Sequence, residues 1–96
     1  MAHGYVIAQI NITDPDAFKG YMKMVKPTVD IYGGEYLVRG GVCVCQEGTP
    51  PGERNVVIRF PTYDVAQEWY NSPEHAPAKA IRMAASNGAM TIVEGV

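Results

Sequence analysis

The stretch from residue 54 to residue 82 limits the possible folds of this chain more than any other segment. It opens with apolar side chains at every second position, namely Val56, Ile58 and Phe60. This period of two predicts a strand with one buried face, and Pro61 ends it. Thr62 is then placed to cap a helix that contains Trp69, the only tryptophan. The stretch is therefore predicted to form a strand, a helix, a corner and a second helical piece.

The segment before this stretch predicts one strand and one helix. Residues 4–12 alternate between apolar and mixed positions, which is typical of a strand with one dry face. Asp14 and Pro15 form a helix start, and apolar residues then recur at helical spacing. Pro27 interrupts the pattern and predicts a bend, because proline removes one helical hydrogen bond. We expect one bent helix over residues 15–32.

Two further strands complete the predicted elements. We expect a long strand over residues 35–39 and 42–46 that bends at Gly40 and Gly41, because glycine inside a strand marks a bend or bulge. Residues 90–94 predict the last strand. The helical piece before it is expected to bury its apolar side, which consists of Ile81, Ala84 and Ala85.

The order of elements is strand, helix, strand, strand, helix, strand. This order predicts a single α+β domain, residues 1–96, of the ferredoxin-like βαββαβ type, with a four-stranded antiparallel sheet and its helices on one face. The opposite face is predicted to mix apolar and polar side chains: Tyr5, Ile7, Gln9, Val57 and Arg59. Such a face is too apolar for water and too polar for a sealed core. We therefore expect a second copy of the chain to cover it.

Charge and composition argue against several classes of function. The net charge is −2 and no run of basic residues occurs, so the electrostatic footprint of nucleic-acid binding is missing. No apolar run approaches the roughly 20 residues that cross a bilayer. The sequence shows no export signal, and its two cysteines fit a reducing compartment. We expect a cytoplasmic protein that binds neither nucleic acid nor membrane.

Short motifs along nearly the whole chain resemble those of the DUF1330 family, a family of small proteins of undetermined function. The motifs are Tyr32-Gly33-Gly34, Arg39-Gly40-Gly41, Glu47-Gly48, Arg54, Phe60-Pro61, Trp69-Tyr70, Ser72-Pro73-Glu74 and Val93-Glu94-Gly95. The resemblance implies membership of the dimeric α/β-barrel superfamily, in which two ferredoxin-like sheets pack face to face, and therefore a homodimer. It does not imply a reaction, because one fold hosts many unrelated functions.

Relatives in that superfamily include cofactor-free monooxygenases, muconolactone isomerase and haem-dependent chlorite dismutases. The chain departs from the family pattern at two places. His75 stands where an aromatic residue often follows Ser-Pro-Glu, and Cys43 and Cys45 form a pair that the family does not show. If the family uses either of these positions for its function, this chain would carry out that function differently.

His75 is the candidate catalytic residue. Its ordinary pKa of roughly 6.5 suits proton transfer at neutral pH, and it lies near a helix start. With Lys79, Arg82 and Ser86 it shares one stripe of a regular helix. The stripe faces either solvent or a ligand, and the sequence leaves both interpretations open.

Four side chains are candidates for substrate binding: Arg39, Trp69, Tyr21 and Arg82. Arg39 stands beside the glycine bend and offers a planar fork that suits a carboxylate or phosphate. Its alternative is a salt bridge to Glu35, to Glu47 or to a partner subunit. Tyr21 and Trp69 belong to the aromatic residues of two helices, which either line a pocket against the sheet or form the core.

Cys43 and Cys45 would point to the same face of the predicted strand. Such neighbours are poorly placed for a disulfide, and the pair with scattered histidines lacks the usual zinc spacing. We expect two small buried hydrophobic residues, with no metal and no cofactor. A metal site shared across a dimer is the alternative.

Two functions remain open at this point. The first is a cofactor-independent enzyme that acts on a small anionic or aromatic metabolite by isomerase, lactone or monooxygenase-type chemistry. In it His75 moves a proton and Arg39 or Arg82 holds an anionic group. The second is a non-catalytic homodimer that binds a metabolite or supports a partner protein. Haem chemistry is a third and less favoured option. The position of His75 relative to a cavity discriminates between the first two.

Overall fold

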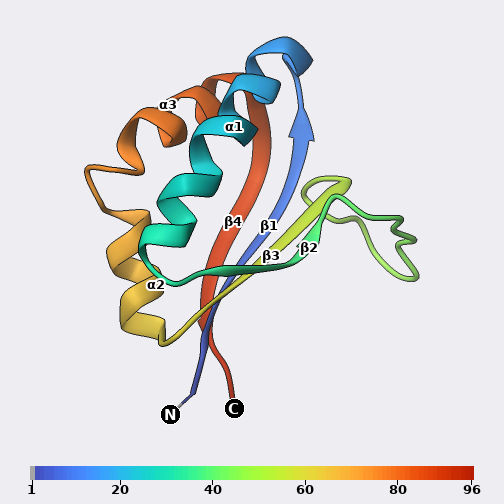
Figure 1. Ribbon diagram of the computed structural model, residues 1–96. Helices are drawn as coiled ribbons and strands as arrows, with labels where there is room; N and C mark the ends of the chain where they lie inside the picture. Colours follow the sequence, from blue (N-terminus) through green and yellow to red (C-terminus); the bar gives the residue numbers. More distant parts are fainter. Residues whose placement is uncertain (1) are drawn as a thin grey trace.

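The computed structural model describes residues 2–96 and places them in two layers (Figure 1). One layer is a sheet of four strands: β1 (Gly4–Ile12), β2 (Glu35–Arg39), β3 (Arg54–Phe60) and β4 (Ser86–Glu94). The other layer consists of three helices: α1 (Pro15–Ile31), α2 (Tyr63–Tyr70) and α3 (Ala76–Ala85). The strands lie in the order β2-β3-β1-β4, and each neighbouring pair is antiparallel. The predicted α+β class and βαββαβ order are confirmed, with α2 and α3 dividing the second helical region.

The helices cover one face of the sheet, and the core lies between the two layers (Figure 1). β1 buries Val6, Ala8 and Ile10, as its alternation predicts, and β3 buries Ile58 and Phe60. From the helices, the largest fully buried side chains are Trp69, Phe18, Val25 and Val29. Within residues 2–96, none of the helices has the length and apolarity needed to cross a membrane.

Both predicted helix starts are confirmed. The Asp14 carboxylate accepts a hydrogen bond from the backbone N–H of Ala17 at 3.2 Å, and the Thr62 hydroxyl accepts one from Val65 at 3.1 Å. Each cap satisfies a backbone donor that has no partner inside its helix. The predicted range of α1 is confirmed to within one residue, and the helix continues through Pro27.

The predicted extension of β2 over residues 42–46 is wrong. β2 ends at Arg39, where Gly40 turns the chain with a φ of 71° and donates its N–H to the carbonyl of Asn55 at 2.8 Å. The neighbouring strand begins only at Arg54, so residues 42–46 have no strand to pair with. The segment 40–53 is instead a loop that projects from the sheet on the side away from the helices (Figure 1).

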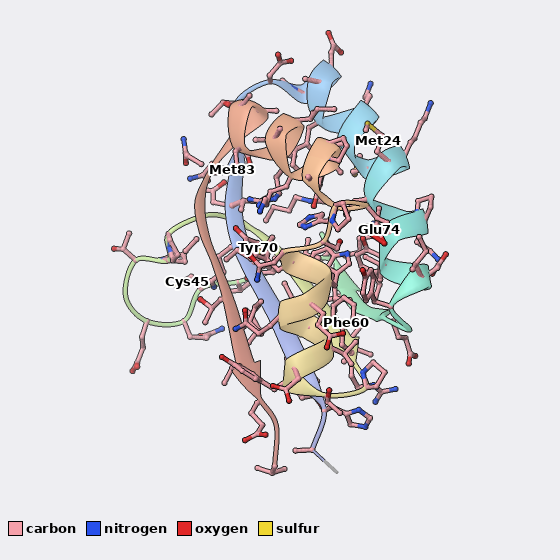
Figure 2. All side chains as sticks on the ribbon, turned by 90° about the vertical axis from the view of Figure 1, so that its left-hand side faces the viewer. Met24, Cys45, Phe60, Tyr70, Glu74 and Met83 are labelled. Carbon is pink, nitrogen blue, oxygen red and sulfur yellow. The ribbon has the colours of Figure 1, made fainter. Side chains whose placement is uncertain are left out.

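The two cysteines lie in this loop and are exposed, so the expectation of two buried residues is also wrong. Figure 2 labels Cys45 on this loop, which Figure 1 shows on the opposite side of the sheet from the helices. The Cys43 sulfur accepts a hydrogen bond from the Asn55 amide at 3.0 Å, and the Cys45 thiol donates to the carbonyl of Glu47 at 3.2 Å. Among residues 2–96, His, Cys, Asp and Glu side chains nowhere gather in the groups of three or more that hold a metal ion.

The end of the chain differs from the prediction in two ways. β4 starts at Ser86, directly after α3, rather than near Met90. The apolar side predicted for α3 is confirmed in part: Ala85 is buried and Ile81 packs half-buried against the core, but Ala78 and Arg82 are buried as well. Ala84 is exposed. A charged side chain therefore occupies the inner face of this helix.

The outer face of the sheet carries the mixture that the sequence predicts. Ile7 is 37% exposed and Val93 is 42% exposed on this side. Polar pairs lie beside them: the Gln9 amide donates to the Asn55 side-chain oxygen at 3.2 Å, and Arg59 pairs with Glu35 at 2.6 Å.

Candidate functional site

A small cavity of about 20 Å³ lies between α1, α3 and the helix-facing side of the sheet. Its aliphatic walls are Val6, Ala8, Ile10, Val25, Val56 and Ile58. The polar groups that border it are three guanidinium groups and two phenols, from Arg39, Arg54, Arg82, Tyr21 and Tyr36. The chain has only four arginines, so three of them meet at one place. A volume of this size holds one or two water molecules.

An irregularity in β2 brings two of these side chains to the cavity. Tyr36 and Arg39 are three residues apart, so a regular strand would point them to opposite faces. A register shift between Tyr36 and Val38 changes this: Tyr36 lies opposite Ile58 and Arg39 opposite Val56 on β3. The extra residue of a bulge moves the following side chains to the other face. Tyr36 and Arg39 consequently both border the cavity.

Arg82 is the most deeply buried charged side chain of the site, with 7% of its surface exposed. Its Nε and Nη2 atoms are buried and have no hydrogen-bond partner among residues 2–96. The Nε atom of Arg54 is likewise buried and has no hydrogen-bond partner among residues 2–96. A buried donor without a partner destabilises the folded protein, and a charged one does so more strongly. The protein groups around the cavity therefore leave these cationic donors without an acceptor in the described chain.

The other two arginines at the cavity are held by weak or neutral partners. Arg39 donates to the carbonyl of Met22 at 3.1 Å and stacks over the Tyr36 ring at 4.4 Å. Arg54 lies 3.6 Å from the Met22 sulfur and 5.6 Å from the centre of the Phe18 ring. The ion pairs among residues 2–96 are Lys26–Asp30 and Arg59–Glu35. The three positive charges at the cavity are therefore not neutralised, and the predicted alternative of a salt bridge for Arg39 is not found in this part of the chain.

Both tyrosines at the cavity remain neutral phenols over the physiological pH range. Burial raises the pKa of Tyr36 to about 12. The nearby Tyr21 and Asp30 also raise this pKa, whereas Arg39 and Arg54 lower it. Burial also raises the pKa of Tyr21, although Arg82, Arg39 and Arg54 oppose it. Each phenol can donate a hydrogen bond. Among the lining residues in the described part of the chain there is no Asp, Glu or His, so the cavity offers mainly donors.

His75 and Trp69 lie in the core and do not border the cavity. Their rings stack with centres 4.0 Å apart and an angle of 24° between planes. The Nδ1–H of His75 donates to the carbonyl of Tyr70 at 3.0 Å, while Nε2 is buried and finds no partner among residues 2–96. The Trp69 indole N–H donates to the Thr28 hydroxyl at 3.0 Å. Of the two interpretations left open for the stripe, a position in solvent does not hold for His75 or Arg82, because both side chains are buried.

Three of the predicted site residues, Tyr21, Arg39 and Arg82, therefore meet at one cavity, and two do not. Sequence reasoning missed Arg54 and Tyr36. Arg54 is the first residue of β3 and stands just before its apolar positions, which is a usable signal for a side chain at the edge of the core. Tyr36 reaches the cavity together with Arg39 only because of the register shift in β2, for which the sequence gives no local signal.

The buried state of His75 predicts a pH dependence of stability. Burial lowers the pKa of His75 below its ordinary value of 6.5. The hydrogen bond to the Tyr70 carbonyl raises this pKa, and the positive charges of Arg82 and Lys79 lower it further. Below pH 6.5 the unfolded chain binds a proton that the folded protein does not. We expect the free energy of unfolding to fall by up to about 1.4 kcal/mol per pH unit as the pH drops from 6.5 toward the folded-state pKa.

Urea unfolding between pH 7.5 and 5 measures this slope. His75→Gln is expected to lower stability at all pH values but to remove this contribution to the slope. His3→Gln, which changes an exposed histidine, is the control and keeps the slope. If the His75→Gln variant shows the same dependence of unfolding free energy on pH as the wild type, His75 has the same pKa in the folded and unfolded states, which contradicts the prediction.

Taken together, the fold and the cavity define a small α+β protein with a ferredoxin-like arrangement and a cationic cavity between its helices and sheet. The chain belongs to the DUF1330 family, because the family model described as "Domain of unknown function (DUF1330)" matches residues 3–96. The family membership expected from the sequence motifs is thereby confirmed.

Solved structures share this fold at low sequence identity. The RPA0582 protein of unknown function from Rhodopseudomonas palustris is similar with a TM-score of 0.75 and 12% identity, over 97% of this chain and 80% of that one. A structure of methylated RPA0582 protein gives a TM-score of 0.69 and 15% identity, over 99% of this chain and 80% of that one. A search of curated proteins finds no match. At these identities the likeness concerns the fold alone.

Proposed function

We propose that this protein binds a small carboxylate with a compact apolar body in the cavity between α1, α3 and the sheet. The observation that carries the proposal is the set of buried, unpartnered guanidinium nitrogens of Arg54 and Arg82. A carboxylate accepts bidentate, charge-assisted hydrogen bonds from arginine and would satisfy these donors. The neutral phenols of Tyr21 and Tyr36 offer further donors, and the aliphatic walls suit an apolar body.

The same geometry favours binding over the proton-transfer enzyme. His75 does not border the cavity, and the lining residues found within 2–96 include no carboxylate that could act as a base. The raised pKa values of Tyr21 and Tyr36 keep both phenols protonated. General-base catalysis needs a group that accepts a proton within hydrogen-bond reach of the substrate. The non-catalytic, metabolite-binding function is therefore the one we advance.

Entry of a ligand larger than two or three heavy atoms requires the cavity to open. Met22 and Arg39 border both the cavity and the open surface outside it. Both side chains are long and unbranched, so they change conformation easily. Arg39 is held at the mouth by one hydrogen bond and by stacking on Tyr36. We infer that these two residues form the movable mouth of the site.

Thermal unfolding with matched carboxylates and amides tests the proposal. We expect acetate, isobutyrate or benzoate at about ten times its dissociation constant to raise the unfolding midpoint by roughly 5–10 °C. The corresponding neutral amides, acetamide, isobutyramide and benzamide, have nearly the same shape but lack the charge, so they are expected to cause little shift. Equal shifts for acids and amides, or none for either up to 50 mM, would contradict carboxylate binding.

We further propose that the outer face of the sheet pairs with a second copy of the chain. The face carries half-exposed apolar side chains of all four strands, among them Ile7, Val38 and Val93. The Arg59–Glu35 pair places both signs of charge on the same face, which suits a self-complementary contact. This support is independent of the cavity.

Sedimentation velocity over a range of concentrations tests the dimer. We expect the wild-type protein to sediment as a dimer at about 10 µM. Ile7→Asp places an unpaired charge in the contact twice, once from each copy, and is expected to weaken association at least roughly 100-fold. Met83→Asp, which changes an exposed residue of α3 on the other side of the molecule, should leave it unchanged (Figure 2). A wild-type monomer at 100 µM would contradict the proposal.

A further inference from the structure

A basic groove adjoins the mouth of the cavity on the outer side of α1. The groove is shallow and open to solvent, and it is lined by Lys19, Met22, Lys23, Lys26, Pro27 and Arg39. Met22 and Arg39 also line the cavity. The groove and the cavity therefore share a wall, and a ligand in the mouth would lie against both.

The distribution of charge makes this groove unusual for the chain. Six of its eight Lys and Arg residues line either the cavity or the groove, although the net charge of the chain is −2. Lys26 is paired with Asp30 at 2.6 Å. Lys19 and Lys23 lie one helical turn apart, are exposed, and make no ion pair within residues 2–96. Two free ammonium groups consequently stand beside the mouth.

We propose that the ligand of the cavity is a dianion, with one carboxylate bound by Arg54 and Arg82 inside and a second anionic group on Lys19 and Lys23 outside. This inference rests on the proposed carboxylate binding in the cavity. Arg39 lies between the two positions and can contact either group. The second group is a carboxylate or a phosphate, both of which an ammonium pair binds. The site would thus select short dicarboxylic acids or phosphorylated carboxylic acids over simple ones.

Elementary electrostatics sets the size of the expected effect. Exposed ion pairs contribute little each and are weakened by salt. Two of them at the groove are therefore expected to tighten binding of a dianion by about 3- to 10-fold at low ionic strength, relative to a monocarboxylate of equal chain length. In 0.5 M potassium chloride most of this advantage should disappear.

Calorimetric titration with four ligands tests the inference. Butyrate and valerate carry one carboxylate, glutarate carries two, and 3-phosphonopropionate carries one carboxylate and one phosphonate. We expect glutarate or 3-phosphonopropionate to bind the wild-type protein about 3- to 10-fold more tightly than valerate or butyrate. Which of the two dianions binds better identifies the second group as carboxylate or phosphate.

Substitutions of lysine test whether the tighter binding of dianions depends on the groove. Lys19→Gln combined with Lys23→Gln is expected to remove the preference for dianions and to leave the affinity for butyrate within about 2-fold. Lys79→Gln removes a lysine that stacks over Tyr70, outside the groove, and should keep the preference. Equal affinities for glutarate and valerate in the wild type, or a preference that survives the double substitution, would overturn the inference.

The same titration separates this inference from the proposed function. If butyrate and valerate bind but the dianions bind no better, only the second subsite fails. If none of the monocarboxylates binds, carboxylate binding in the cavity itself fails and the inference falls with it. If glutarate binds the Arg82→Met variant as tightly as the wild type, the ligand lies on the groove alone, which refutes a bridging dianion.

Discussion

Trp69→Ala is expected to lower the free energy of unfolding by about 3–5 kcal/mol, the range for truncating a large aromatic side chain in a close-packed core. Trp69 is fully buried, stacks on His75 at 4.0 Å and packs against Phe60 at 5.2 Å. Its indole N–H also donates to the Thr28 hydroxyl of α1, so the substitution removes a hydrogen bond between α2 and α1. Urea unfolding monitored by circular dichroism measures the loss.

A matched variant separates packing from the hydrogen bond. Trp69→Phe keeps an aromatic ring on His75 but loses the bond to Thr28, so we expect a smaller loss of about 1–2 kcal/mol. A chain of this size has a stability of only about 5–15 kcal/mol, and Trp69→Ala would therefore leave it close to unfolding. A loss below about 1 kcal/mol for Trp69→Ala would mean that the ring is not the centre of the core.

Arg82→Met is the second substitution with a large expected effect. It should stabilise the folded protein and at the same time abolish ligand binding. Met fills part of the space of the arginine stem without a charge or an unpartnered donor, so the free energy of unfolding should rise by about 1–3 kcal/mol. The same substitution removes the deepest guanidinium group of the cavity and should abolish the binding of benzoate. Denaturant unfolding and calorimetric titration of one preparation measure both quantities.

The control for this variant is Arg59→Met. Arg59 lies on the outer face of the sheet, is paired with Glu35 at 2.6 Å, and does not border the cavity. It should keep benzoate binding. It serves as a control for binding alone, because the Arg59–Glu35 pair also lies on the proposed dimer face. If Arg82→Met were strongly destabilised and still bound benzoate, the arginine would serve the fold rather than the ligand.

Local sequence patterns correctly predicted the buried side of β1 and the first residues of two helices. The alternation of β1 placed Val6, Ala8 and Ile10 in the core, and Asp14 and Thr62 cap their helices as their positions predict. Each of these features depends on residues within a few positions along the chain. The βαββαβ order followed from these elements together.

Features that depend on distant parts of the chain were predicted less well. Residues 42–46 have strand-forming side chains, but whether they form a strand depends on β3, which starts too late to pair with them. Cys43 and Cys45 are exposed as a result. A strand is stable only beside another strand, so intrinsic preference does not decide its length.

The candidate site was predicted in part for a similar reason. Arg82 was selected as an anion-binding residue, but a charged residue on a helix is ordinarily exposed, so its burial could not be read from α3. The register shift in β2, which turns Tyr36 and Arg39 to one face, is visible only in the paired strands. His75 is polar in sequence, yet it lies against Trp69 in the core.

A crystal structure of the protein grown with saturating benzoate tests the central claim most directly. The claim is that the unpartnered nitrogens of Arg54 and Arg82 exist to bind a carboxylate. We predict that the benzoate oxygens lie about 2.7–2.9 Å from these nitrogens and that Met22 and Arg39 have moved to admit the ring. A cavity that contains only water molecules bonded to both arginines, with Met22 and Arg39 unmoved, would contradict it.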